Sequence, residues 1–212
     1  MNLPSTYFIS VSSPATKSMK NVKIIGGEDI DITDAPYQVS LVYAGKFLCG
    51  GTIVAPDLVI TAAHCGHQYH PSIMLCKPHK ISEIMICLHI NLGYILFQSH
   101  GFPKKLQRVE VPVVSEESCR NDYVNISAIW HMYITPRSLC AGLSIGGKGS
   151  CDGDSGGPLV YHGKLAGIVS WSNGCASPNF PDVFTKVSAL RKWIDDTIKH
   201  LRLNHTMRAQ IY

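Results

Sequence analysis

From Ile24 onward the chain is a series of short apolar runs separated by turn residues. Residues 36–41 alternate polar and apolar side chains, as a half-buried β-strand does. Similar runs predict strands at residues 58–62, 109–114, 164–171 and 183–187. Many short strands with turn signals between them predict an all-β barrel or sandwich.

Two stretches predict helices instead. Ser115 precedes Glu116 and Glu117, which fits an N-cap followed by acidic residues in the first turn. After Ser188, apolar residues recur at spacings of three and four, which predicts an amphipathic helix near the C-terminus. These residues are Ala189, Leu190, Trp193, Ile194 and Ile198.

The two ends of the chain lack such a pattern. Residues 1–23 carry prolines, serines and three lysines without a clear period, so we expect a mobile leader there. We expect the tail after His200 to fray. The predicted organisation is a leader or propeptide at 1–23, a folded domain at 24–200 and a tail at 201–212.

The composition is that of a globular protein. Hydrophobic residues make up 45% of the 212 residues and charged residues 16%, which is enough to build a core. The net charge of +4 is mild, and the basic residues are scattered, whereas a nucleic-acid binder carries a concentrated basic stripe. No run approaches the roughly 20 apolar residues of a membrane span. We therefore expect neither nucleic acid nor membrane as a partner.

The eight cysteines stand at long, irregular spacings without Cys-x-x-Cys pairs. This favours disulfides in an oxidising compartment, and hence secretion, over a zinc site. A signal peptide, however, needs an apolar core of about seven residues or more. Residues 7–11 are too few and have polar flanks, so we expect either an incomplete start or export by another route.

The strongest chemical signal is Cys-Asp-Gly-Asp-Ser-Gly-Gly-Pro at residues 151–158. A nucleophilic serine needs a tight turn that exposes its Oγ and backbone N–H groups aimed at a developing oxyanion. The glycines around Ser155 permit such a backbone. The alternative is an ordinary glycine-rich hairpin loop.

A second signal is Thr-Ala-Ala-His-Cys at residues 61–65. A neutral histidine can accept the serine proton near pH 7. His64 ends a predicted strand beside Cys65, which could pin it. A single histidine is more often structural, but the pairing with the serine motif favours a catalytic base.

Further motifs make a family resemblance specific. They are Ile-Ile-Gly-Gly at 24–27, Pro-Tyr-Gln-Val-Ser-Leu at 36–41, Cys-Gly-Gly-Thr at 49–52, Gly-Lys-Gly-Ser-Cys at 147–151 and Ile-Val-Ser-Trp at 168–171. With the serine and histidine motifs, the chain resembles the trypsin/chymotrypsin-like serine proteases over residues 24–66 and again over about 109–198.

The resemblance implies two six-stranded β-barrels with the active site between them, followed by a C-terminal helix. It makes His64 the base, Ser155 the nucleophile, and the N–H groups of Gly153 and Ser155 the oxyanion hole. It also makes Lys23–Ile24 the activation bond of a zymogen. The freed amine of Ile24 would then pair with Asp154, a carboxylate that has no obvious local partner. The alternative is a solvated Asp154 in an Asx turn.

Three disulfides are implied by the resemblance: Cys49–Cys65, Cys119–Cys140 and Cys151–Cys175. The first would brace His64, and the third would brace the substrate pocket. Cys76 and Cys87 have no counterpart in the family. They could pair with each other or stay free.

The middle of the chain departs from the family, whose third catalytic residue is an aspartate. Residues 66–108 contain no Asp, and their only carboxylate is Glu83. The run at 82–88 is loosely similar to the family's aspartate strand, with Glu83 in its place. A second echo would put Ser72 there, which offers no acid. The segment is also several dozen residues shorter than usual, so we expect an incomplete first barrel with unpaired edges.

This segment is also rich in histidine, with His67, His70, His79, His89 and His100. His64, His67 and His70 are three residues apart, but they have neither a clear helix nor an acidic fourth ligand. We therefore expect no metal site and no cofactor.

In trypsin-like relatives, an aspartate six residues before the nucleophile recognises Lys or Arg. Here that position is Gly149, while Asp182 falls on the pocket wall, where it could partly restore attraction for a basic side chain or fill the pocket, and Ser172 narrows the entrance. The implied pocket consists of Gly149, Ser150, Ser170, Trp171, Ser172 and Asp182. We expect mixed specificity, with basic side chains accepted weakly and large apolar ones accepted as well.

The leading hypothesis is a secreted, monomeric serine endopeptidase that acts on proteins or peptides. Its partners would include protease inhibitors and an activating protease that cuts after Lys23. One alternative is an impaired protein that keeps the cleft and binds other proteins without hydrolysis. The other is a truncated product that folds poorly.

Overall fold

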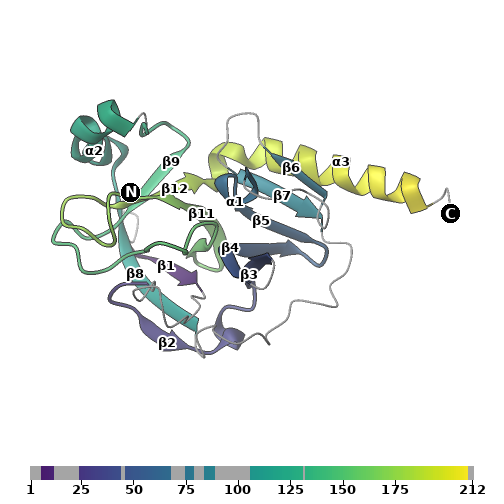
Figure 1. The fold of residues 1–212 in the computed structure, drawn as a ribbon, viewed down its shortest axis with the longest axis horizontal. Helices are drawn as coiled ribbons and strands as arrows, with labels where there is room; N and C mark the ends of the chain where they lie inside the picture. Colours follow the sequence, from purple (N-terminus) through teal and green to yellow (C-terminus); the bar gives the residue numbers. More distant parts are fainter. Residues whose placement is uncertain are drawn as a thin grey trace.

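The computed structural model describes residues 6–11, 24–43, 46–67, 75–78, 84–88, 106–130 and 132–209. These residues form two antiparallel sheets that lie next to each other, with three α-helices around them (Figure 1). The short helix α1 (His64–His67) follows one sheet, α2 (Glu116–Trp130) covers the other, and α3 (Arg191–Ala209) ends the chain.

The larger sheet closes on itself. Its order is β1-β10-β11-β12-β9-β8-β2, and β1 also pairs with β8, so that six strands form a barrel and β2 extends it beside β8. The strands are β1 (Thr6–Val11), β2 (Glu28–Ile30), β8 (Leu106–Val114), β9 (Ser138–Ala141), β10 (Pro158–Tyr161), β11 (Lys164–Trp171) and β12 (Asp182–Lys186). Its core consists of Ile24, Val109, Val111, Ala141, Leu159, Val169 and Phe184.

The smaller sheet has the order β3-β4-β5-β7-β6. Its strands are β3 (Gln38–Tyr43), β4 (Lys46–Ala55), β5 (Leu58–Ala62), β6 (Leu75–Pro78) and β7 (Ile84–Leu88). Within the described residues, β3 and β6 are outer strands, so this sheet does not close. The helix α3 lies along it (Figure 1), and Ile194 and Leu201 share a core with Leu58 and Ile60.

This architecture confirms the predicted all-β, trypsin-like double barrel with a C-terminal helix. The strands predicted at 58–62 and 164–171 form at those residues, and the other three form within a few residues of their predicted positions. The predicted N-cap is also present, since Ser118 N–H donates to Ser115 Oγ at 3.1 Å.

The two chain ends differ from expectation. The prediction that the chain frays after His200 is wrong, because α3 runs on to Ala209 and buried Leu201 continues the apolar stripe of Ile194 and Ile198 against the sheet. The supposedly patternless leader contributes β1 at residues 6–11, whose partners β8 and β10 lie about a hundred residues or more further along the chain. Whether residues 1–23 act as a propeptide is a separate proposal.

The three disulfides implied by the resemblance are present: Cys49–Cys65, Cys119–Cys140 and Cys151–Cys175. They join residues 16, 21 and 24 positions apart, and each is worth about 3 kcal/mol in the chain-entropy account. Cys76 and Cys87 are register partners in the β6–β7 pair, so the backbone brings these two positions together.

Candidate active site

His64 follows a rigid strand. All five residues of β5 are buried, and Ala63 is 2% exposed, whereas His64 itself is exposed at the start of α1. The next residue, Cys65, is tied to Cys49 in β4. The buried strand and the disulfide therefore fix the backbone on both sides of His64, while its side chain stays accessible to solvent.

Ser155 lies in a tight turn between the two sheets. The turn is closed by Asp154 N–H donating to Cys151 O (3.0 Å) and Gly157 N–H donating to Asp154 O (3.0 Å). Gly156 has φ +83°, and a Cβ there would lie 2.1 Å from Thr61 Oγ1. Only glycine fits at this position, because the loop presses directly on β5.

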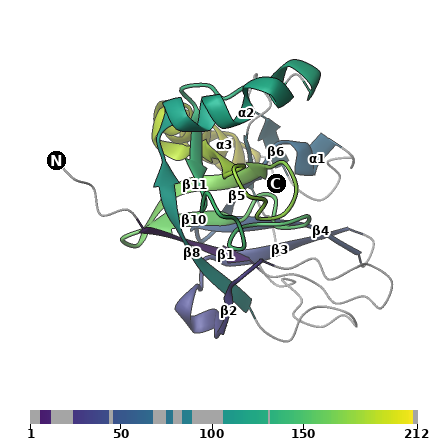
Figure 2. The same cartoon turned by 90° about the vertical axis from the view of Figure 1, so that its left-hand side faces the viewer.

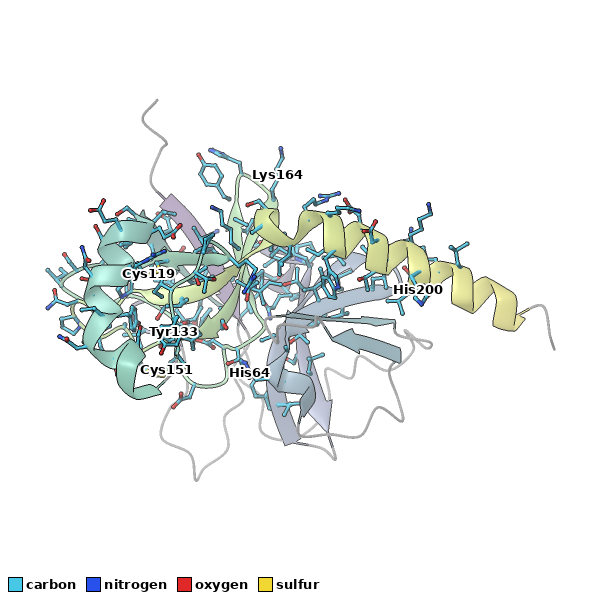
Figure 3. All side chains as sticks on the ribbon, turned by 90° about the horizontal axis from the view of Figure 1, so that it is seen from above. His64, Cys119, Tyr133, Cys151, Lys164 and His200 are labelled. Carbon is cyan, nitrogen blue, oxygen red and sulfur yellow. A yellow bond between two sulfur atoms is a disulfide. The ribbon has the colours of Figure 1, made fainter. Side chains whose placement is uncertain are left out.

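The loop and the histidine strand meet at Ser155. Gly50 N–H in β4 donates to the carbonyl oxygen of Ser155 at 2.8 Å, and Cys65 Sγ lies 3.9 Å from the same oxygen. Figure 3 shows His64 at the boundary between the two sheets, near the loop that carries Cys151. The residue next to His64 thus contacts Ser155, so the predicted base and the predicted nucleophile lie on neighbouring segments.

Two backbone donors remain available beside Ser155. Gly153, at φ +92°, and Ser155 both have N–H groups that donate to no other atom in the described part of the chain. Other N–H groups of this loop are used, since Gly156 N–H donates to Val169 O at 2.8 Å. Two free donors next to a serine can receive a negatively charged oxygen.

Asp154 is completely buried, and only one of its two carboxylate oxygens has a hydrogen-bond partner among the described residues. Its Oδ2 accepts a hydrogen bond from Cys151 N–H at 2.9 Å, while Oδ1 is buried without a hydrogen-bond partner among the described residues. Burial raises the pKa of Asp154 to about 7 against the lowering effect of the Cys151 bond, and the carboxylates of Asp182 and Asp152 add to the rise. A cation at Oδ1 would relieve this cost.

Ile24 is buried, and the residue after it is bound to the segment that leads to Ser155. Ile24 is 5% exposed and belongs to the core of the closed barrel, while Ile25 N–H donates to Gly149 O at 2.9 Å and Ile25 O accepts from Gly149 N–H at 3.1 Å. The residue before it, Lys23, lies outside the described residues. The start of the predicted protease domain is therefore anchored to the loop that leads to Ser155.

A second buried carboxylate, Asp182, faces Gly149. It is 2% exposed, its Oδ2 accepts from Ser150 N–H, and its Oδ1 has no hydrogen-bond partner in the described structure. Burial raises the pKa of Asp182 to about 6, although the N–H and the hydroxyl of Ser150 lower it. The structure thus brings three predicted pocket residues together around one acidic group.

The remaining pocket residues line the end of β11 and the loop after it. Ser170, Trp171 and Ser172 are half-buried, and Ser172 Oγ donates to Gly174 O at 2.6 Å. The Cys151–Cys175 disulfide connects this loop to the turn that carries Ser155.

Sequence analysis did not identify Tyr123, which packs against residues of the predicted substrate pocket. Its ring is fully buried against Trp171 and Phe180. Its hydroxyl donates to Pro181 O at 2.8 Å and accepts from Asn173 N–H at 3.3 Å. Burial raises the pKa of Tyr123. Only its position in the predicted helix α2, four residues after Cys119, hinted that it would face the core.

Glu83, the candidate third catalytic residue, lies outside the described residues, as does Ser72. The residue after Glu83, Ile84, begins β7 and is the register partner of Ala62, which lies two residues before His64. Of the histidines in this segment, His70, His79, His89 and His100 also lie outside the described residues, and His67 is described only in its backbone.

Two groups of metal-binding residue types occur within the described chain: Cys49, His64 and Cys65, and Cys151, Asp152 and Cys175. All four cysteines are oxidised in disulfides, so they offer no thiolate. Each group retains one ordinary ligand, which does not fit the donor set of a zinc site. Among the described helices, none has both the length and the hydropathy to cross a bilayer.

Comparison with known proteins agrees with this geometry. The sequence matches the family described as Trypsin over residues 24–84 and 87–194. It is 40% identical to a vitellin-degrading protease of Bombyx mori (94% of each chain), 33% to cationic trypsin-3 of Rattus norvegicus (83% of this chain, 90% of the relative) and 32% to hypodermin-B of Hypoderma lineatum (84% and 88%). The silkworm alignment spans 255 positions, more than this chain's 212 residues, so that relative carries residues with no counterpart here. The chain belongs to the trypsin family of serine proteases.

Proposed function

We propose that this chain is an endopeptidase with Ser155 as nucleophile and His64 as general base. The observation that carries this proposal is the junction at Ser155, whose carbonyl oxygen accepts from Gly50 and contacts Cys65 beside His64. The unused N–H groups of Gly153 and Ser155 support an oxyanion hole at the same place.

The chemistry follows from these positions. His64 accepts the proton of Ser155 Oγ as Oγ attacks the substrate carbonyl carbon, and the two N–H groups stabilise the resulting oxyanion. His64 then gives the proton to the leaving amine. Water, activated by His64, releases the second product from the acyl-serine and restores both side chains.

The enzyme is made inactive and is switched on by cleavage of the Lys23–Ile24 bond. Support comes from Asp154, whose Oδ1 is buried without a hydrogen-bond partner among the described residues, and from buried Ile24, whose neighbour Ile25 is hydrogen-bonded to Gly149. A new α-amino group at Ile24 would provide the missing cation. Formation of this ion pair would fix the Gly153–Ser155 turn in its active geometry.

The pocket has mixed specificity and accepts a basic side chain weakly, through Asp182. Its unpartnered Oδ1 offers a buried acceptor, and Gly149 leaves room beside it. Because Asp182 stands on the wall, apolar side chains also fit.

Proteins are the substrates of this family, and an activating protease and protein inhibitors are further partners of a monomeric enzyme. Three disulfides favour an extracellular location.

One observation favours a second candidate, a protein that binds without hydrolysis. Residues 66–108 hold no aspartate, and Glu83 is their only carboxylate. Loss of the triad carboxylate's function costs about 10⁴-fold in turnover. Glu83, which precedes the register partner of Ala62, is our candidate for that role.

Labelling with a fluorophosphonate probe tests the proposal. After controlled cleavage at Lys23, the chain should gain one phosphonyl group, and Ser155→Ala should gain none. Absence of labelling in a cleaved chain that still melts cooperatively would favour the binding protein. Absence of labelling in a chain that does not melt cooperatively would favour the poorly folding product.

A further inference from the structure

The strand β1 is formed by residues that precede the proposed cleavage bond, yet it is one of the six strands that form the closed barrel. Figure 2 shows β1 alongside β8 and β10. Its register with β8 runs over all six residues, from Thr6 opposite Pro112 to Val11 opposite Gln107. On its other side, Phe8 and Ile9 pair with Val160 and Leu159 of β10.

Without β1, this barrel would be an open sheet. The remaining order, β10-β11-β12-β9-β8-β2, leaves β10 as an outer strand and one edge of β8 unpaired. Unpaired edges expose backbone N–H and C=O groups and favour aggregation. The leader strand thus supplies the hydrogen-bonding partner for both edges.

The register also relates β1 to the barrel core. Ile9 is the partner of both Val109 and Leu159, which are 2% and 0% exposed, and Tyr7 is the partner of Val111, which is 0% exposed. Directly opposed residues in antiparallel strands share a face. Positions 7 and 9 therefore fall on the core face of the barrel. Position 8 falls on the opposite face, where its partners are exposed Glu110 and buried Val160.

Both sides of the proposed cleavage bond are held independently by β8. Arg108 is the register partner of Ser10 in β1 and of Glu28 in β2, and Arg108 also forms an ion pair with Glu28 at 2.6 Å. Cutting the connection between them breaks neither set of strand pairs. Residues 1–23 contain no cysteine, so none of these residues can be tied to the body by a disulfide after the cut.

We infer that residues 6–11 are a permanent strand of the closed barrel and stay bound to it after cleavage at Lys23–Ile24. The mature protein is then a two-chain molecule held together by β-strand pairing, not a domain that has released its leader. This inference rests on the proposed function only for the place of the cut.

The test cuts the leader without activating the enzyme. The recognition sequence of a sequence-specific protease replaces residues 15–19, so that Ile24 stays preceded by residues 20–23 after the cut. We expect the leader fragment to co-elute with the body in non-denaturing size exclusion and to separate from it in guanidinium chloride. Elution of the fragment apart from the body under native conditions would overturn the inference, whether or not the body stays folded.

A cross-link tests the register itself. Phe8→Cys with Glu110→Cys places two cysteines at directly opposed positions, where Cβ atoms are about 4.5–5.5 Å apart. In the matched control, Phe8→Cys with Arg108→Cys, the positions are diagonal and about 7–8 Å apart, beyond disulfide reach. After the cut, a non-reducing denaturing gel should show the fragment attached in the first variant and free in the control. A free fragment in both would contradict the register.

Neither readout uses catalysis. An inactive chain that retains its leader would refute the proposed function and leave the strand inference standing. An active enzyme that loses its leader would do the reverse.

Discussion

The carboxylate of Asp182 occupies the space that a side chain at position 149 would need. A Cβ built on Gly149 would lie 2.7 Å from Asp182 Oδ2 and 3.4 Å from Ala176 Cβ. The acidic group of this pocket therefore comes from the wall strand β12, and the glycine is what makes room for it.

Asp182→Ala should reduce the acceptance of basic residues relative to apolar ones. The ratio of kcat/KM for matched Lys and Leu peptide substrates should fall at least about tenfold, which corresponds to about 1.4 kcal/mol of transition-state stabilisation. Asp152→Asn is the matched control, because Asp152 is an exposed acid close to the same loop. An unchanged ratio in Asp182→Ala would remove this residue from specificity.

Gly149→Asp should destabilise the chain, because the new carboxylate would overlap the buried one. We expect a loss of about 1–3 kcal/mol, typical of overpacking, measured by urea unfolding. The double variant Gly149→Asp with Asp182→Gly should recover most of this loss, since it moves the charge without adding a second one. Equal stability of the single variant and the parent would contradict the steric account.

The stability of the uncleaved chain should fall as the pH rises from about 4 to about 7. A carboxyl whose pKa is higher in the folded state binds more protons there, so raising the pH through this range favours unfolding. The ionisation of Asp154, with a pKa of about 7, would lower the free energy of unfolding by on the order of 4 kcal/mol above pH 7. The ionisation of Asp182, with a pKa of about 6, would add to this loss.

Urea midpoints at pH 4.5 and pH 7.5 measure this slope. Asp154→Asn should flatten it, leaving the part that belongs to Asp182, and cleavage after Lys23 should also flatten it by supplying an ammonium partner. Glu117→Gln, at an exposed residue in the first turn of α2, should leave it unchanged. A slope in Asp154→Asn as steep as in the parent would show that Asp154 is not the group responsible.

Glu83→Gln should slow the reaction of Ser155 with a fluorophosphonate, toward the roughly 10⁴-fold loss seen when a triad carboxylate is neutralised. Glu83→Asp should lose less, because it keeps the charge. Glu116→Gln, on the exposed start of α2, is the control. Equal labelling rates in Glu83→Gln and the parent would leave His64 without a carboxylate partner from this segment.

Tyr123→Phe should destabilise the proposed substrate pocket and weaken substrate binding, although residue 123 itself does not contact the substrate. It leaves Pro181 O and Asn173 N–H without their partner, at a cost of about 1–3 kcal/mol in the free energy of unfolding. We expect a higher KM for the preferred substrate with a smaller change in kcat. Tyr133→Phe, at a residue 57% exposed, is the matched control and should match the parent in stability and KM.

The sequence alone was sufficient where the signal is local. Two strands formed at their predicted residues because apolar runs bounded by turn residues leave few alternatives. Ser115 caps α2 because its hydroxyl reaches a donor three residues away. The Ser155 and His64 motifs each encode their own turn and strand end, so their local geometry could also be expected.

Only the tertiary structure decided the features that depend on distant partners. Residues 6–11 become a strand because β8 and β10 offer two complementary edges, which the pattern of the leader itself does not reveal. The helix α3 extends beyond His200 because Leu201 finds the small sheet. Asp182 and Gly149 are 33 residues apart, and the pairing of β12 beside β11 brings them together. Local chemistry fixes what each segment can do, and the free energy of burial selects which segments meet.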